Sequence, residues 1–365
     1  MTTHVLRAAA GALVALLATG CNGGGATAPH LGTGKAAAPI LSNLHTQTTI
    51  GSTVDPGPGT GAGDENPYGL AIAPVSAGKL TAGDLVVCNF NDAANVQGNG
   101  TTIVVLHPTP GATPTRVAQS SSLKGCNALT LDGGDAIYTA DFVANGAPIF
   151  TPNGTLASAN ANAAWSGPFG AIFSPTAGTF GSASVFESNA TSGTVSRMDI
   201  QGGAVVGVET IATGFKPNTG VPGSILGPSG LTYDPSSDQL YVVDGGANRL
   251  VAFTQASSIP ANGIVVGAAS FTGPSAANAR IVSANPAINA PVSAALLANG
   301  DVVVGNTGDN NMLEFTPSGG LVATKNVDSG SAGAIFGIVA TGTTPANQKI
   351  YFNDDNANAV VLISQ

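Results

Sequence analysis

One short motif recurs along this chain of 365 residues and constrains its fold more than any other feature. The clearest copy is residues 227–255, GPSGLTYDPSSDQLYVVDGGANRLVAFTQ. Two clusters of turn-forming residues, 234–237 and 244–248, separate three runs of β-branched or alternating residues, which predicts three antiparallel strands. A sheet of this size cannot bury both of its faces, so it needs neighbouring copies to pack against.

Five more segments follow the same plan and begin near residues 66, 126, 167, 290 and 334. The positions equivalent to Gly230 hold small residues, which lie 42 to 63 residues apart: Gly69, Ala128, Gly170, Ser293 and Gly337. Six small antiparallel sheets in succession predict an all-β fold, a six-bladed β-propeller.

The ends of the chain predict how the ring closes. The last copy stops at Gln365 after three strands. Residues 41–50 alternate in character and have no sheet of their own. We therefore expect this N-terminal strand to complete the last blade as its outer strand, which makes residues 41–365 one propeller domain.

Composition limits the possible partners. Charged residues make up 8% of the chain, and with 11 Lys+Arg the net charge is −9, which disfavours a nucleic-acid partner. The high content of Gly (50) and Pro (23) fits a turn-rich all-β protein. The scarcity of charge is open to two interpretations: adaptation to an acidic exterior, where few basic groups limit positive self-repulsion, or a compositional bias of the source.

The segments 227–234 (GPSGLTYD) and 240–250 (LYVVDGGANRL) resemble an NHL repeat, the unit of six-bladed propellers. The resemblance extends over most of residues 64–365, although three of the copies match mainly by position. It implies the fold and leaves the function open, because such propellers include binding scaffolds, lyases and lactonases.

The N-terminus predicts export. Arg7 precedes an apolar run at 8–18 that is too short to span a bilayer, so residues 1–20 are interpreted as a signal peptide. Residues 17–21 (LATGC) resemble a bacterial lipobox, which implies a lipid on Cys21. Residues 22–40 carry Gly, Ala, Thr and Pro without periodicity, so we interpret 21–40 as a lipid-anchored flexible tether. By the same resemblance, Asn22 favours the outer membrane of the cell envelope. The alternative is ordinary secretion after Ala18 or Gly20.

Polar residues end each predicted second strand and begin some of the inner strands. In a propeller these positions meet near the mouth of the central channel. Their oxygen atoms are candidates for holding Ca²⁺ or another divalent cation: Glu65, Asn66, Asn127, Asp141, Glu187, Asp244 and Asp354. The alternative is that each side chain accepts hydrogen bonds from the turn that follows it.

Resemblance to gluconolactonases bears on the first three of these residues. Those enzymes place an acid before the first inner strand and Asn or Asp at the mouth in other blades, as Glu65, Asn66 and Asn127 do here. The other inner strands depart from that pattern, since they begin at Phe169, Ser229, Val292 and Phe336. The aromatic residues Tyr68, Phe169 and Phe336 either line a ligand pocket or pack between blades.

Histidine and cysteine narrow the chemistry further. The four histidines show no metal-binding spacing, and none falls on an inner strand, where virginiamycin-type lyases are expected to need one. If Cys21 carries lipid, Cys88 and Cys126 remain as an even pair in an oxidising compartment. They form a disulfide between blades 1 and 2 or stay as buried free thiols.

These observations predict a lipid-anchored binding or scaffolding module at the cell envelope, with a protein, glycan or small molecule as ligand. The alternative is a metal-assisted lyase or hydrolase at the channel mouth. A third possibility is a structural surface protein.

Overall fold

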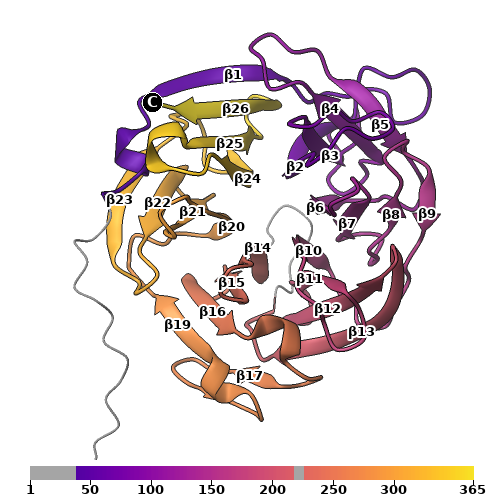
Figure 1. The fold of residues 1–365 in the computed structure, drawn as a ribbon. Helices are drawn as coiled ribbons and strands as arrows, with labels where there is room; N and C mark the ends of the chain where they lie inside the picture. Colours follow the sequence, from indigo (N-terminus) through magenta and orange to yellow (C-terminus); the bar gives the residue numbers. More distant parts are fainter. Residues whose placement is uncertain (1–37, 218–225) are drawn as a thin grey trace, which may run out of the picture. The chain divides into compact units, whose positions relative to one another are not determined.

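The computed structural model describes residues 38–217 and 226–365. The predicted signal peptide and Cys21 lie outside the described residues. In the described part, six β-sheets are arranged around a central axis as a six-bladed propeller (Figure 1). The predicted fold class is confirmed. No helix among the described residues is both long enough and apolar enough to cross a membrane.

Each blade is a meander that runs outward from the axis. The innermost strands of blades 1 to 6 are β2 (Glu65–Ile72), β6 (Cys126–Leu131), β10 (Pro168–Ser174), β14 (Pro228–Asp234), β20 (Pro291–Leu296) and β24 (Ile335–Thr341). The second strands are β3 (Leu85–Asn91), β7 (Ile137–Asp141), β11 (Ala183–Asn189), β15 (Gln239–Asp244), β21 (Val302–Asn306) and β25 (Lys349–Asp354). The third strands are β4 (Thr102–Leu106), β8 (Ile149–Phe150), β12 (Thr194–Gln201), β16 (Arg249–Thr254), β22 (Asn311–Phe315) and β26 (Ala359–Ser364). The fourth strands are β5 (Thr115–Gln119), β9 (Leu156–Ser158), β13 (Ala204–Thr213), β19 (Ala279–Ser283), β23 (Leu321–Asn326) and, for blade 6, β1 (Thr46–Ser52).

The ring closes as predicted, with a shift in the closing strand. β1 pairs antiparallel with β26, from Thr46 opposite Ser364 to Ser52 opposite Ala359, and Figure 1 shows it as the outer strand of blade 6. The strand begins at Thr46 and not at Leu41, because residues 41–43 form the 3₁₀ helix η1 (Leu41–Asn43). Leu41 and Leu44 are fully buried in the core that blades 5 and 6 share, and this burial turns the segment away from the sheet.

Blade 3 is wider than the repeat predicts. The connection between β16 and β19 contains η2 (Ala256–Ser258), β17 (Ile264–Val266), β18 (Phe271–Thr272) and η3 (Ala276–Asn278). β17 pairs in parallel with β13, and β18 extends the same sheet. The remaining 3₁₀ helix is η4 (Pro345–Asn347), in the β24–β25 connection.

The core lies between the blades, where apolar side chains of facing sheets meet. Between blades 1 and 2, for example, Val86 and Ile103 pack in one buried cluster with Leu129 and Phe150. Each such side chain contributes roughly 1.5–3 kcal/mol when it is removed from water. The small residues at the anchor positions let neighbouring inner strands come close together. A Cβ on Gly170 would lie 2.3 Å from the carbonyl oxygen of Ser229 in the next blade.

Candidate functional site at the channel mouth

A β-bulge in every inner strand shapes the mouth of the channel. In each blade the pairing between the first and second strands shifts register near the start of the inner strand. A bulge adds backbone on one strand and re-aims its side chain. The residues placed there are Tyr68, Asn127, Phe169, Ser229, Val292 and Phe336. The positions that sequence analysis assigned to the inner-strand starts are therefore equivalent in space.

The second strand contributes one equivalent residue per blade, which we call the rim position: the residue paired with the last inner-strand residue before the bulge. It holds Asn or Asp in all six blades: Asn89, Asp141, Asn189, Asp244, Asn306 and Asp354. All six side chains are buried. Asn189 accepts the Ser166 N–H and Asn306 accepts the Asn289 N–H, both from the loop that leads into their own blade. In these two blades the rim residue therefore holds, by a hydrogen bond, the loop that connects the blade to the preceding one.

Aromatic side chains narrow the mouth. Tyr68 stacks on Phe336 at a centroid distance of 3.6 Å and on Phe90 at 4.3 Å, with nearly parallel rings. Together with Phe169 and Val292, these rings belong to one apolar cluster. The cavity at this level measures about 60 Å³, and Tyr68, Asn127, Phe169 and Phe336 all contribute to its wall. The three predicted aromatic residues therefore line a shared cavity and at the same time pack across blades.

The channel widens beyond the aromatic residues. A second cavity of about 310 Å³ follows along the inner strands and shares Leu70, Leu129, Ala171 and Leu231 with the first. Its wall consists of Leu, Ile, Val, Ala and Thr from all six inner strands.

Three of the predicted polar residues form hydrogen bonds to a neighbouring blade: Glu65, Asn66 and Asn127. The Asn66 backbone N–H donates to Asn358 Oδ1 at 2.7 Å, and its side chain donates to Asp355 Oδ2 at 3.0 Å. Asn358 Nδ2 in turn donates to Glu65 Oε2. Asn66 adopts a positive φ of 62°, which Asn tolerates better than most residues. These contacts join the first blade to the β25–β26 turn of the last.

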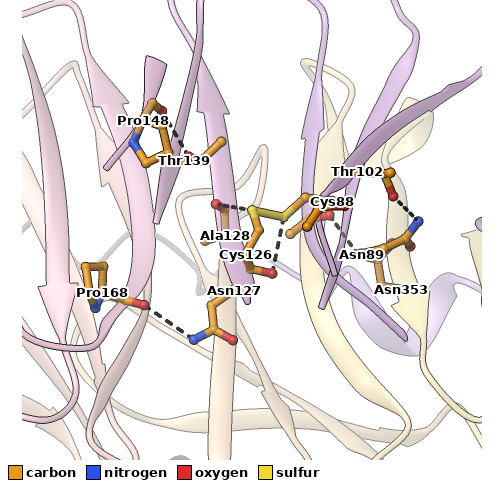
Figure 2. Close-up of a disulfide and its surroundings, with 12 residues drawn as sticks. Cys88, Asn89, Thr102, Cys126, Asn127, Ala128, Thr139, Pro148, Pro168 and Asn353 are labelled. Atoms are coloured by element: carbon orange, nitrogen blue, oxygen red, sulfur yellow. Dashed lines mark hydrogen bonds between the residues drawn. A yellow bond between two sulfur atoms is a disulfide. The ribbon is translucent and has the colours of Figure 1, made fainter. Parts of the chain in front are cut away.

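Asn127 makes the corresponding contact between blades 2 and 3. Its Nδ2 donates to the Pro168 carbonyl oxygen at 3.3 Å (Figure 2). Its Oδ1 has no hydrogen-bond partner among the described residues, although it is buried. Asn127 is thus the one predicted polar candidate that both lines the mouth cavity and keeps a free acceptor.

Asp141 and Glu187 are fully buried and have no solvent access. None of their four carboxylate oxygens has a hydrogen-bond partner within the described part of the chain. Burial raises the pKa of Asp141 well above its ordinary value. Burial, followed by the nearby charge of Asp141, does the same to the pKa of Glu187. Both groups therefore favour the neutral acid.

The last two predicted carboxylates are held locally. Asp244 accepts a bond of 2.7 Å from Arg249 Nε, and burial nevertheless raises its pKa. Asp354 accepts the Ala357 N–H of the following turn, and burial raises its pKa as well. Its neighbour Asp355 has a pKa raised to about 7, chiefly by burial. Sequence analysis anticipated the turn contact of Asp354 but missed Arg249 as the partner of Asp244.

Cys88 and Cys126 form a disulfide across blades 1 and 2, as predicted (Figure 2). Both residues are fully buried, and Cys126 directly precedes the bulge residue Asn127. The crosslink therefore joins the second strand of blade 1 to the inner strand of blade 2 beside the mouth cavity.

Metal-binding residues do not converge in the described ranges, 38–217 and 226–365. No group of three or more His, Cys, Asp or Glu side chains there is placed to hold a metal ion. His107 lies outside the channel and contacts Asp84, which immediately precedes β3.

Comparison with known proteins supports the fold and leaves the chemistry open. The sequence matches no protein-family model and no curated protein. Solved propellers do resemble the structure. A virginiamycin B lyase from Staphylococcus aureus shares 15% identity at a TM-score of 0.52, covering 88% of this chain and 98% of the other. A gluconolactonase from Xanthomonas campestris shares 12% identity at a TM-score of 0.55, with coverages of 82% and 87%. A chain from the crystal structure of a nidogen/laminin complex shares 14% identity at a TM-score of 0.53, with coverages of 77% and 87%. The chain is a six-bladed propeller with structural neighbours among these lyases and lactonases.

Proposed function

We propose that this chain is a lipid-anchored binding module at the cell envelope and that it contacts its ligand with the face around the channel mouth. The NHL-like repeats, the lipid on Cys21 and the outer-membrane location belong to this proposal. One observation carries the choice of binding over catalysis. The polar residues expected to do chemistry, Glu65 and Asn66, form blade-to-blade hydrogen bonds, while aromatic rings fill much of the mouth.

The mouth face also presents apolar side chains to solvent. Val96 is 48% exposed in the β3–β4 connection, and Val143 is 38% exposed in the β7–β8 connection. Both connections follow second strands, so they lie at the same end of the propeller as the bulges. These two side chains give the mouth face apolar surface that a partner could cover.

The test compares the two faces. The double variant Val96→Asp/Val143→Asp alters the mouth face, and Val75→Asp is the matched control, since Val75 is 39% exposed in the β2–β3 connection at the opposite end. Immobilised protein is incubated with detergent-solubilised envelope, peptidoglycan fragments and lipopolysaccharide from the source cells. We expect a saturable ligand that the mouth variant loses and the control retains. Equal retention by both variants contradicts the assigned face, and no saturable binding contradicts a binding module.

The anchor is tested separately. Metabolic labelling with a radioactive fatty acid should label the native chain and not a Cys21→Ser variant, and the variant should leave the membrane fraction. An unlabelled native chain contradicts the anchor without affecting the binding proposal.

A metal-assisted lyase or hydrolase is the second candidate, favoured by the structural neighbours and by the free Asn127 Oδ1 on the mouth cavity. The donor set does not fit a metal centre well, because Glu65 and Asn66 are engaged elsewhere and no group of three ligating side chains converges in the described residues. Metal analysis by mass spectrometry, melting with and without EDTA, and a screen of lactones and esters test it. A stoichiometric ion together with turnover would replace the binding proposal.

A further inference from the structure

The segment Pro39–Leu44, which we call the strap, crosses blade 5 before the chain enters β1. Ile40, Leu41 and Leu44 are at most 1% exposed. They pack in one cluster with Leu297 and Met312 of blade 5 and with residues of blade 6. Unlike β1, the strap is not part of a sheet, so its backbone N–H groups need other partners.

One carboxylate supplies those partners. Glu314 lies in β22 and is fully buried. Its Oε1 accepts the Ile40 N–H at 2.8 Å, and its Oε2 accepts the Leu41 N–H at 2.7 Å. Hydrogen bonds to an ionised acceptor are roughly twice as strong as neutral ones. The strap is therefore held most firmly when Glu314 carries its negative charge.

A second carboxyl group lies against the first. Asp301, which precedes β21, is 3% exposed and lies within hydrogen-bonding reach of Glu314. Asn299 Nδ2 donates to Asp301 Oδ2 at 2.9 Å and to Glu314 Oε1 at 3.3 Å, so it holds the two groups together. Two buried carboxylates in contact cannot both ionise readily. Burial and the adjacent Glu314 raise the pKa of Asp301 to about 7.

Among the described residues, no cation forms an ion pair with these two carboxyl groups. The surrounding elements carry few charged groups: Lys325 on β23, Lys349 on β25 and His45 directly after the strap. None of these forms an ion pair with Glu314 or Asp301 among the described residues. A proton on Asp301 can donate to Glu314 and leave Glu314 charged toward the strap. Loss of that proton leaves two adjacent negative charges in the core.

We propose that the strap is a proton-controlled latch, docked on blade 5 while Asp301 and Glu314 share one proton and released when that proton is lost. The latch acts where the N-terminal segment joins the propeller, just ahead of the strand that closes the ring. Its release exposes Ile40, Leu41 and Leu44 and frees the chain up to Thr46, while the β1–β26 pairing remains.

Hydrogen–deuterium exchange of the purified full-length mature protein tests this latch. Protection of residues 40–44 is followed by mass spectrometry from pH 5.5 to 8.5 and corrected for the intrinsic exchange rate. We expect native protection to fall by up to about tenfold per pH unit from pH 5.5 to about pH 7, where the docked strap holds the proton and the released strap does not, and to level off above about pH 7.5. The Asp301→Asn variant should stay protected across the range, because its amide cannot ionise. Glu314→Gln should lose protection at every pH.

Asp355→Asn is the matched control, since Asp355 also has a pKa raised to about 7 but contacts Asn66 in blade 1. Its strap profile should follow that of the native protein. A native profile that stays flat from pH 5.5 to 7 overturns the latch without recourse to any variant. A pH step that survives in Asp301→Asn, or that disappears in Asp355→Asn, also overturns it.

Discussion

Removal of the Cys88–Cys126 disulfide should cost this propeller a large part of its stability. The two cysteines are 38 residues apart, and in the chain-entropy treatment closing such a loop stabilises the fold by about 4 kcal/mol. With an m-value of about 3 kcal/mol/M or more for a chain of this size, the urea midpoint should fall by roughly 1 M. Equilibrium unfolding with and without a reductant that acts on the unfolded chain measures the change.

The double variant Cys88→Ala/Cys126→Ala separates the crosslink from packing. Both sulfur atoms lie in the buried cluster with Leu129 and Phe150, so the variant loses their contacts as well as the bond. It should unfold at a lower urea concentration than reduced native protein, and reduced native protein at a lower one than the oxidised form. Equal midpoints for the oxidised and reduced native protein would refute the assigned role of the crosslink.

Two other substitutions probe the ring. Gly170→Ala should destabilise the fold by about 1–3 kcal/mol, because its Cβ would clash with the Ser229 carbonyl oxygen, whereas Gly133→Ala, with open space at the Cβ position, should leave the urea midpoint unchanged. Similar midpoints for the two variants would mean that the inner strands can move apart freely. Arg249→Met should cost about 3–5 kcal/mol, since it leaves the buried Asp244 carboxylate without its cation. A loss below 1 kcal/mol in thermal or urea unfolding would argue that this pair is dispensable.

The repeat made the blades and their closure predictable, because strands of alternating character and turn clusters are local signals. The anchor glycines were also visible in the sequence. The reason for a glycine at position 170 is visible only in the structure, where a Cβ would lie 2.3 Å from a backbone oxygen of the neighbouring blade. The strap was not foreseen: residues 41–50 resembled one strand, and tertiary burial of Leu41 and Leu44 overrode that pattern. Glu314 is the one acidic residue in the strand Asn311–Phe315, and its presence in an otherwise uncharged strand could have indicated a buried hydrogen-bond acceptor.

The mouth residues show where sequence reasoning stopped. The sequence showed that Asn or Asp lies near the end of most second strands. Because all second strands of a propeller end at the same face, these residues were expected to lie on that face. Their partners were not visible, since Asn66 contacts Asn358 across nearly the whole chain length. Whether a carboxylate faces solvent, a turn or another blade is decided by residues distant in sequence. For this reason the sequence did not show that Glu187 would be fully buried without a hydrogen-bond partner among the described residues.

The shortage of basic residues predicts how stability changes with pH. With 11 Lys+Arg against 20 Asp+Glu, the fold buries Asp141 and Glu187 without cations and raises their pKa values. Burial also raises the pKa values of Asp301 and Asp355, each to about 7. A carboxyl group whose pKa is raised by folding adds stability that is complete below its unfolded pKa and lost as the pH rises through its folded pKa.

The urea midpoint should therefore be higher at pH 5 than at pH 8. The loss due to Asp301 and Asp355 should be spread between their unfolded pKa of about 4 and their folded pKa of about 7, and be nearly complete just above pH 7. Glu187→Gln should raise the midpoint at high pH more than at pH 5, because the neutral amide has no proton to lose. Gly133→Ala serves as a control with unchanged titration. A native midpoint that rises from pH 5 to pH 8 contradicts this account and removes the physical support for adaptation to an acidic exterior.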